Sequence, residues 1–142
     1  MGKNARRATR RLLMQAFYQK QLTGHDLPEL RGQFSASDEF AKVDSEYFAL
    51  LFAEVDAAVQ DLDVMIGRYG DIPADQLDPV ERAILWVAIG ELQFHPEVPK
   101  KVVINEAIEL AKMFGAEGGH RYVNALLDKV AAGPKSRFSR RS

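Results

Sequence analysis

Apolar residues recur at helical spacing over residues 102–130, and the pattern predicts a helical hairpin. The first stripe lies along a helix of about four turns and comprises Val103, Ile104, Ala107, Ile108 and Ala111. The second comprises Tyr122, Val123, Leu126, Leu127 and Val130. Gly115 ends the first helix, and the link over 116–119 is so short that the two helices must be neighbours in space.

Four further helical segments precede the hairpin, and three of them lie before residue 70. The first helix is expected over 5–22, with Leu12, Leu13, Ala16 and Phe17 as its buried stripe. A short helix is expected over 26–34 and a long one over 43–69. The acidic residues of the long helix are interpreted as a solvated face, and they include Glu46, Glu54, Asp56, Asp61 and Asp63.

A strongly capped helix is predicted to begin at Pro79. Asp78 stands at the N-cap position and Pro79 at the first helical position, while Glu81 is an acid of the first turn that we expect to be exposed. From Ala83 to Leu92 the chain is apolar almost without interruption, so this helix, including Trp86, is expected to be buried from several sides. No strand pattern occurs, and the sequence predicts an all-α fold of six to seven helices.

Length and composition narrow the class of protein. The 142 residues form one predicted helical domain over 1–132 and a basic tail over 133–142 that is expected to be disordered. No apolar run approaches the length of a membrane span and no secretion signal is found, so we expect a cytoplasmic protein. The absence of cysteine and the scattered histidines His25, His95 and His120 argue against a metal or cofactor site. No catalytic constellation is present, and enzyme activity is not expected.

Charges are segregated along the chain. Residues 1–11 and 129–142 each carry five basic and no acidic side chains, whereas 12–128 carry 9 basic and 20 acidic ones, a net charge of −11. This asymmetry indicates an anionic ligand at the ends and a different, basic partner on the body. Basic ends that only aid solubility remain the alternative.

Arginines crowd the first turns of the first helix. Positive charge there opposes the helix macrodipole by roughly 0.3–1 kcal/mol per charge, so helix stability does not explain Arg6, Arg7 and Arg10. Binding of phosphate or of an acidic partner does explain them, although their methylene stems could instead cover the core. Tyr18, further along, is either a half-buried ring or a contact residue.

Several segments resemble the transcription antitermination factor NusB family. These are INEAIELAKMFGAEGGHRYVNALLDKVA over 104–131, ARRATRRLLMQAFYQKQL over 5–22, and PVERAILWVAIGEL followed by VPKKVVINEAIELAK over 79–92 and 98–112. The resemblance implies two packed helical subdomains. It also implies binding of single-stranded boxA RNA together with NusE, a small-subunit ribosomal protein, in a complex that joins elongating RNA polymerase at ribosomal RNA operons.

The same resemblance implies particular contact residues. It assigns RNA binding to Lys3, Arg6, Arg7, Arg10, His120, Arg121 and Tyr122. It assigns the NusE surface to Tyr18 and Glu81. Arginines suit phosphates, and flat side chains can stack on unpaired bases. The first and last helices would then be two halves of one RNA surface. Gly118 and Gly119 depart from the polar or charged residues that family members often carry there.

Two other functions remain open at this stage. A homodimeric protein-interaction module would hide the RNA site, since some NusB-like proteins self-associate. An accessory domain of an RNA methyltransferase is the other, because NusB-like domains occur fused to such enzymes. A chain ending at Ser142 leaves no room for a methyl-donor domain, which argues against it.

Overall fold

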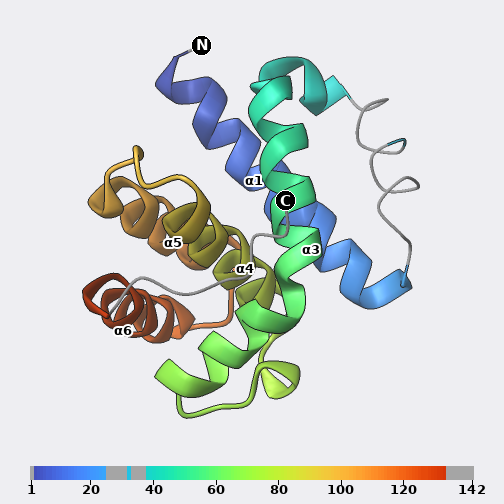
Figure 1. The fold of residues 1–142 in the computed structure, drawn as a ribbon. Helices are drawn as coiled ribbons and strands as arrows, with labels where there is room; N and C mark the ends of the chain where they lie inside the picture. Colours follow the sequence, from blue (N-terminus) through green and yellow to red (C-terminus); the bar gives the residue numbers. More distant parts are fainter. Residues whose placement is uncertain (1, 25–31, 33–37, 134–142) are drawn as a thin grey trace.

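The chain folds into helices packed around one buried helix (Figure 1). The computed structural model describes residues 2–24, 32 and 38–133. Within these ranges the α-helices are α1 (Lys3–Thr23), α3 (Ser45–Tyr69), α4 (Pro79–Phe94), α5 (Lys100–Phe114) and α6 (Gly119–Ala132). Two 3₁₀ helices, η1 (Asp38–Lys42) and η2 (Ala74–Gln76), add one short turn each. The all-α class is confirmed, while the helix expected over 26–34 and the tail over 134–142 lie outside the described residues.

Local signals place the helix ends where the sequence predicts them. The Asp78 carboxylate accepts the N–H of Val80 at 2.8 Å and caps α4, with Pro79 at the first position. Asp44 caps α3 in the same manner by accepting the N–H of Tyr47 at 3.2 Å. Helix α1 ends at Gly24, whose φ of 72° is the left-handed conformation that glycine tolerates.

Helix α4 is the centre of the core, as its apolar sequence predicts. It packs against α1, α3, α5 and α6, and every side chain from Ala83 to Ile89 is buried. Trp86 is 3% exposed and meets Phe17 edge to face at 6.0 Å between ring centroids. The predicted α1 stripe of Leu12, Leu13, Ala16 and Phe17 is buried against it.

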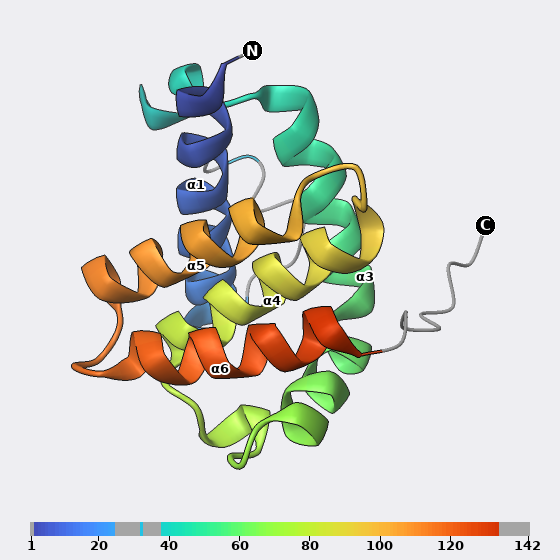
Figure 2. The same ribbon diagram turned by 90° about the vertical axis from the view of Figure 1, so that its left-hand side faces the viewer.

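Two groups of helices meet at α4, in agreement with the expected subdomains. Helices α1 and α3 pack on each other, and α5 packs on α6 as the predicted hairpin. Both views show α5 lying between α1 and α6 (Figures 1 and 2). Helix α5 therefore separates the two helices that were expected to share one RNA surface.

The acids of α3 are less solvated than the sequence suggests. Asp63 accepts hydrogen bonds from the Arg82 guanidinium at 2.7 Å and from Trp86 Nε1 at 2.8 Å. Asp56 pairs with Lys20, and the Glu54 carboxylate accepts from His95 Nε2 at 2.6 Å. The interpretation as a solvated face holds for Glu46 and Asp61, which are exposed. It was wrong for Glu54, Asp56 and Asp63, because these acids tie α3 to the loop after α4, to α1 and to α4.

Candidate nucleic-acid interface

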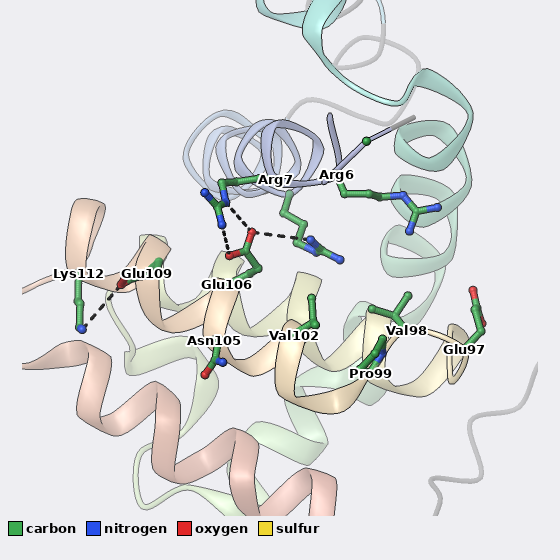
Figure 3. A pocket seen from close by; sticks show the side chains of 12 residues that line it. Arg6, Arg7, Glu97, Val98, Pro99, Val102, Asn105, Glu106, Glu109 and Lys112 are labelled. Carbon is green, nitrogen blue, oxygen red and sulfur yellow. Dashed lines mark hydrogen bonds and ion pairs between the residues drawn. The ribbon is translucent and has the colours of Figure 1, made fainter. Parts of the chain in front are cut away.

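An open groove runs between the first half of α1 and the outer face of α5 (Figure 3). Its volume is about 850 Å³. The basic residues on its lining are Arg6, Arg7, Arg10 and Lys112, and the acidic ones are Glu97, Glu106 and Glu109. Val98, Pro99 and Val102 form its apolar part. Arginines from α1 thus face a mixed surface on α5 rather than the start of α6.

Arg7 is the most exposed of the groove arginines. Its side chain is 64% exposed, and its Nε and Nη2 donate to the two carboxylate oxygens of Glu106 at 3.0 and 3.3 Å. The hydrogen bond that Arg7 donates to Glu106 raises the pKa of Arg7. A guanidinium carries five N–H donors, so the outward donors of Arg7 are left for a phosphate.

Arg6 lies beside the start of α3. Its guanidinium carbon is 3.6 Å from the centroid of the Tyr47 ring, and its Nε donates to Asp44 at 3.4 Å. The side chain is 37% exposed. Arg6 is therefore partly held by the fold, yet it still presents a cation to the groove.

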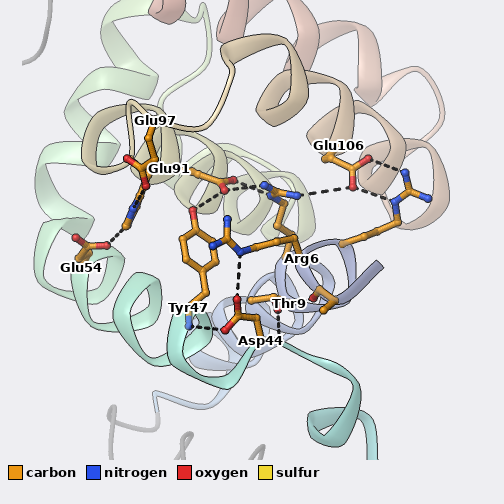
Figure 4. Close-up of polar contacts among 12 residues, drawn as sticks. Arg6, Thr9, Asp44, Tyr47, Glu54, Glu91, Glu97 and Glu106 are labelled. Carbon is orange, nitrogen blue, oxygen red and sulfur yellow. Dashed lines mark hydrogen bonds and ion pairs between the residues drawn. The ribbon is translucent and has the colours of Figure 1, made fainter. Parts of the chain in front are cut away.

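Arg10 is buried, contrary to the expectation of an exposed cation. Its Nε and Nη2 each donate to Glu91 at 2.8 Å, and its side chain is 7% exposed (Figure 4). The Tyr47 hydroxyl donates to the same carboxylate at 2.6 Å. Arg10 Nη1 lies 3.9 Å from Glu106, so Glu106 is placed between Arg10 and Arg7. Burial explains this arrangement, because an enclosed carboxylate requires a cation and hydrogen-bond donors.

Sequence reasoning did not identify every residue at the groove. Glu106 gave no signal of its own, because it contacts an arginine 99 positions earlier in the chain. Arg11, four residues after Arg7, does not line this groove, and its guanidinium carbon lies 4.9 Å from the centroid of the Phe114 ring on α5. Lys3 is the first residue of α1, and its side chain lies outside the described residues.

The start of α6 holds the second set of predicted RNA residues. Arg121 is exposed and His120 is half-buried. Tyr122 is half-buried, and its ring packs against the core instead of standing free. Its hydroxyl is enclosed and meets no partner with full hydrogen-bond geometry in the described part of the chain. Burial raises its pKa, and the nearby Ile72 backbone opposes that shift. The half-buried ring leaves only part of its surface for stacking.

The two predicted partner residues differ in exposure. Tyr18 is half-buried and packs against the core. Glu81 is only 6% exposed, so the expectation of an exposed acid was wrong. Its carboxylate turns inward and accepts the backbone N–H of Ala116, in the turn between α5 and α6, at 3.1 Å.

Neither a metal site nor a membrane-spanning helix is found among the described residues. Over 2–24, 32 and 38–133, no three His, Cys, Asp or Glu side chains gather in a way that could hold a metal ion. No helix in those ranges is long and apolar enough to cross a membrane. The groove thus places arginines and a lysine on an all-helical scaffold, an arrangement suited to a phosphate-bearing ligand.

Comparison with known proteins then gives the family. The sequence model of the NusB family matches residues 7–132, so the chain belongs to the NusB family. Transcription antitermination protein NusB of Shewanella amazonensis is 46% identical over 132 residues, covering 93% of this chain and 98% of the relative. The corresponding protein of Alcanivorax borkumensis is 48% identical over 128 residues, covering 90% and 85%.

Solved structures agree with this fold. NusB of T. maritima superposes with a TM-score of 0.82 at 29% identity, covering 95% of this chain and 96% of that one. A crystal structure of antitermination factors NusB and NusE in complex with double-stranded RNA gives a TM-score of 0.75 at 21% identity, covering 92% and 98%. The second likeness shows the shared fold.

Proposed function

We propose that this protein binds boxA-type single-stranded RNA together with NusE and acts in transcription antitermination, joining elongating RNA polymerase at ribosomal RNA operons. It acts by binding rather than by catalysis. The observation that carries the proposal is family membership over residues 7–132, with relatives called transcription antitermination proteins at up to 48% identity. A relative of the same fold has been solved with NusE and RNA.

The groove residues divide into two roles in this proposal. Arg6 and Arg7 contact phosphates directly, because both keep exposed guanidinium surface at the groove. Arg10 supports them from below through Glu106. His120 and Arg121 provide the contacts from the start of α6, with Tyr122 offering the free part of its ring. Lys3, the first residue of α1, belongs to the same RNA-binding set in this proposal.

The partner surface follows from charge and position. Residues 12–128 carry a net charge of −11, which suits a basic ribosomal protein. Tyr18 is the residue through which α1 meets NusE in this proposal. The start of α4 lies near Tyr18, because Gln21, one turn after Tyr18, donates to the carbonyl of Pro79 at 2.8 Å. Glu81 lies at this end of α4 but is only 6% exposed and turns inward, so Tyr18 carries the side-chain contact to NusE in this proposal.

A salt titration of RNA binding tests the proposal. If about four phosphates are neutralised, log K should fall with log salt at a slope near −3 for single strands, and Arg7→Ala should reduce the slope by about 0.7. Arg68→Ala, which removes an exposed arginine of α3 outside the groove, is the matched control and should leave the slope unchanged. Both titrations are run with NusE present.

Three comparisons complete that experiment. Equal affinity for boxA-like and scrambled RNA in the presence of NusE would overturn the proposal. A duplex of the same sequence is the third ligand, since a relative has been solved with double-stranded RNA. Sedimentation at the same protein concentration separates a binding-competent monomer from the homodimer alternative.

A further inference from the structure

Glu81 has an unusual position for an acid in the first turn of a helix. Such acids ordinarily face solvent, but Glu81 is 6% exposed and its carboxylate points across to the turn that joins α5 to α6. Oε2 accepts the N–H of Ala116 at 3.1 Å, over a separation of 35 residues. The N-cap function of α4 belongs to Asp78, so Glu81 is not needed for it.

The turn is closed tightly around this carboxylate. A Cβ atom on Gly119 would lie 2.6 Å from Glu81 Cδ and closer still to Oε2, and one on Gly115 would lie 3.2 Å from Oε2. Gly118, between them, has a φ of +79°, which side chains rarely tolerate. The glycines at 118 and 119 are therefore explained by geometry: one supplies the backbone conformation and the other admits Glu81.

Helix α6 lacks an anion of its own at its start. Its N-cap residue is Gly118, no side chain caps it, and its first turn contains no acid. An isolated carboxylate near a helix N-terminus is stabilising because it faces the positive end of the macrodipole. Glu81 of α4 supplies that negative charge from outside the helix, next to Gly119, the residue before His120.

We infer that Glu81 is a positioning residue for RNA binding, which holds the 115–119 turn so that His120 and Arg121 are presented in a fixed place. The inference rests on the function proposed above and assigns Glu81 to the RNA turn, whereas the sequence assigned it to the partner surface. Its carboxylate touches neither ligand. It acts through the backbone of Ala116 and through its contact with Gly119.

Loss of the Glu81 contact is expected to weaken RNA binding, because the turn would then have to become ordered when RNA binds. With the turn released, two side chains must be immobilised again on binding, which weakens RNA affinity by roughly five- to tenfold. The NusE affinity stays at the wild-type value, because no exposed surface of Glu81 is lost. The affinity split between the two ligands is the readout that a general loss of stability would not produce.

Three variants of the full-length chain test this inference. Glu81→Ala removes the acceptor, while Glu81→Gln keeps an oxygen that can accept the Ala116 N–H. Glu46→Ala is the matched control, because Glu46 occupies the first turn of α3 but is exposed. For each, the dissociation constants for boxA-like RNA with NusE saturating and for NusE alone are measured, together with amide hydrogen exchange at Ala116.

Expected results are faster Ala116 exchange and weaker RNA binding for Glu81→Ala, recovery of both in Glu81→Gln, and no change in Glu46→Ala. Faster exchange with unchanged RNA affinity would overturn the inference, as would loss of NusE affinity with RNA affinity retained. If Glu81→Ala does not fold, Gly119→Ala keeps the glutamate but displaces it, and should weaken RNA binding alone. Failure of the wild type to prefer boxA-like RNA would instead overturn the proposed function, and the Ala116 exchange would still report on the turn.

Discussion

Helix α4 carries two buried glutamates, one near each end, and the fold treats them differently. Glu91 is fully enclosed and accepts two hydrogen bonds from Arg10 and one from Tyr47. Glu81 is 6% exposed and accepts the backbone N–H of Ala116 at 3.1 Å, with no cation paired to it in the described residues. One carboxylate is neutralised by a buried network, and the other is not.

The difference has an electrostatic consequence. Burial raises the pKa of Glu81, with the nearby charge of Asp78 adding to the effect and the Ala116 N–H opposing it. An acid with a raised pKa in the folded state contributes stability below its unfolded pKa, near 4.5, and loses it as the pH rises through the folded value. Ionisation of Glu81 therefore lowers the stability of the fold as the pH rises through the folded pKa. The Glu91 network joins α1, α3 and α4, whereas the Glu81 carboxylate joins α4 to the turn between α5 and α6.

The largest effect should come from removing the cation of the Glu91 network. Arg10→Ala leaves a fully buried carboxylate without its counter-charge, which costs about 3–5 kcal/mol in the free energy of unfolding. Urea denaturation measures this loss. Arg7→Ala on the same helix is the control and should destabilise far less, because the Arg7 side chain is 64% exposed. Equal losses in the two variants would show that Glu91 does not depend on Arg10.

A smaller loss is expected from the third member of the same network. Tyr47→Phe removes the hydroxyl that donates to Glu91 at 2.6 Å but keeps the ring beneath Arg6. A hydrogen bond to a charged group contributes about 1.5–3 kcal/mol, so the urea midpoint should fall by the corresponding amount. Burial and the hydrogen bond to Glu91 both raise the Tyr47 pKa, so this difference should persist through the pH range in which a free tyrosine begins to ionise. An unchanged midpoint would contradict the assignment of this hydrogen bond.

The smallest effect, and one of opposite sign, is expected in the first turn of α6. Tyr122→Phe removes an enclosed hydroxyl that meets no partner with full hydrogen-bond geometry among the described residues, although the Ile72 backbone lies near it. Because an unpaired buried polar group costs free energy, the variant should be as stable as the wild type or more stable, by up to about 1 kcal/mol. The same denaturation series measures it, and RNA affinity should be retained because the ring remains. A clear destabilisation would mean that the hydroxyl is hydrogen-bonded in solution.

Most of the fold could be predicted because local signals in the sequence determine where the helices lie. Helix periodicity, the Asp78–Pro79 start and the stop at Gly115 each depend on residues within a few positions, and the helices lie where these signals place them. Burial of Trp86 and of the α1 stripe followed from the same patterns. The short helix expected over 26–34 stays a prediction, since it lies outside the described residues.

The candidate site was predicted less completely, because its defining contacts join distant parts of the chain. Arg10 is paired with a residue 81 positions away, so its spacing beside Arg6 and Arg7 gave no sign of burial. Glu81 looked like an exposed first-turn acid, since its contact with Ala116 depends on the crossing of α4 with the hairpin. Arg6 and Arg7 kept exposed surface, as their positions on α1 suggested.

The contact between Glu81 and Gly119 also links the two positions in sequence variation. A side chain at position 119 would collide with the carboxylate, and because that carboxylate ends a flexible side chain, residue 81 must turn away or be shortened to admit it. We therefore expect the two positions to vary together among relatives, with a polar residue at 119 accompanied by a different path for residue 81. Variation at Gly118 should not depend on residue 81, because the requirement for glycine there comes from the backbone φ of +79°.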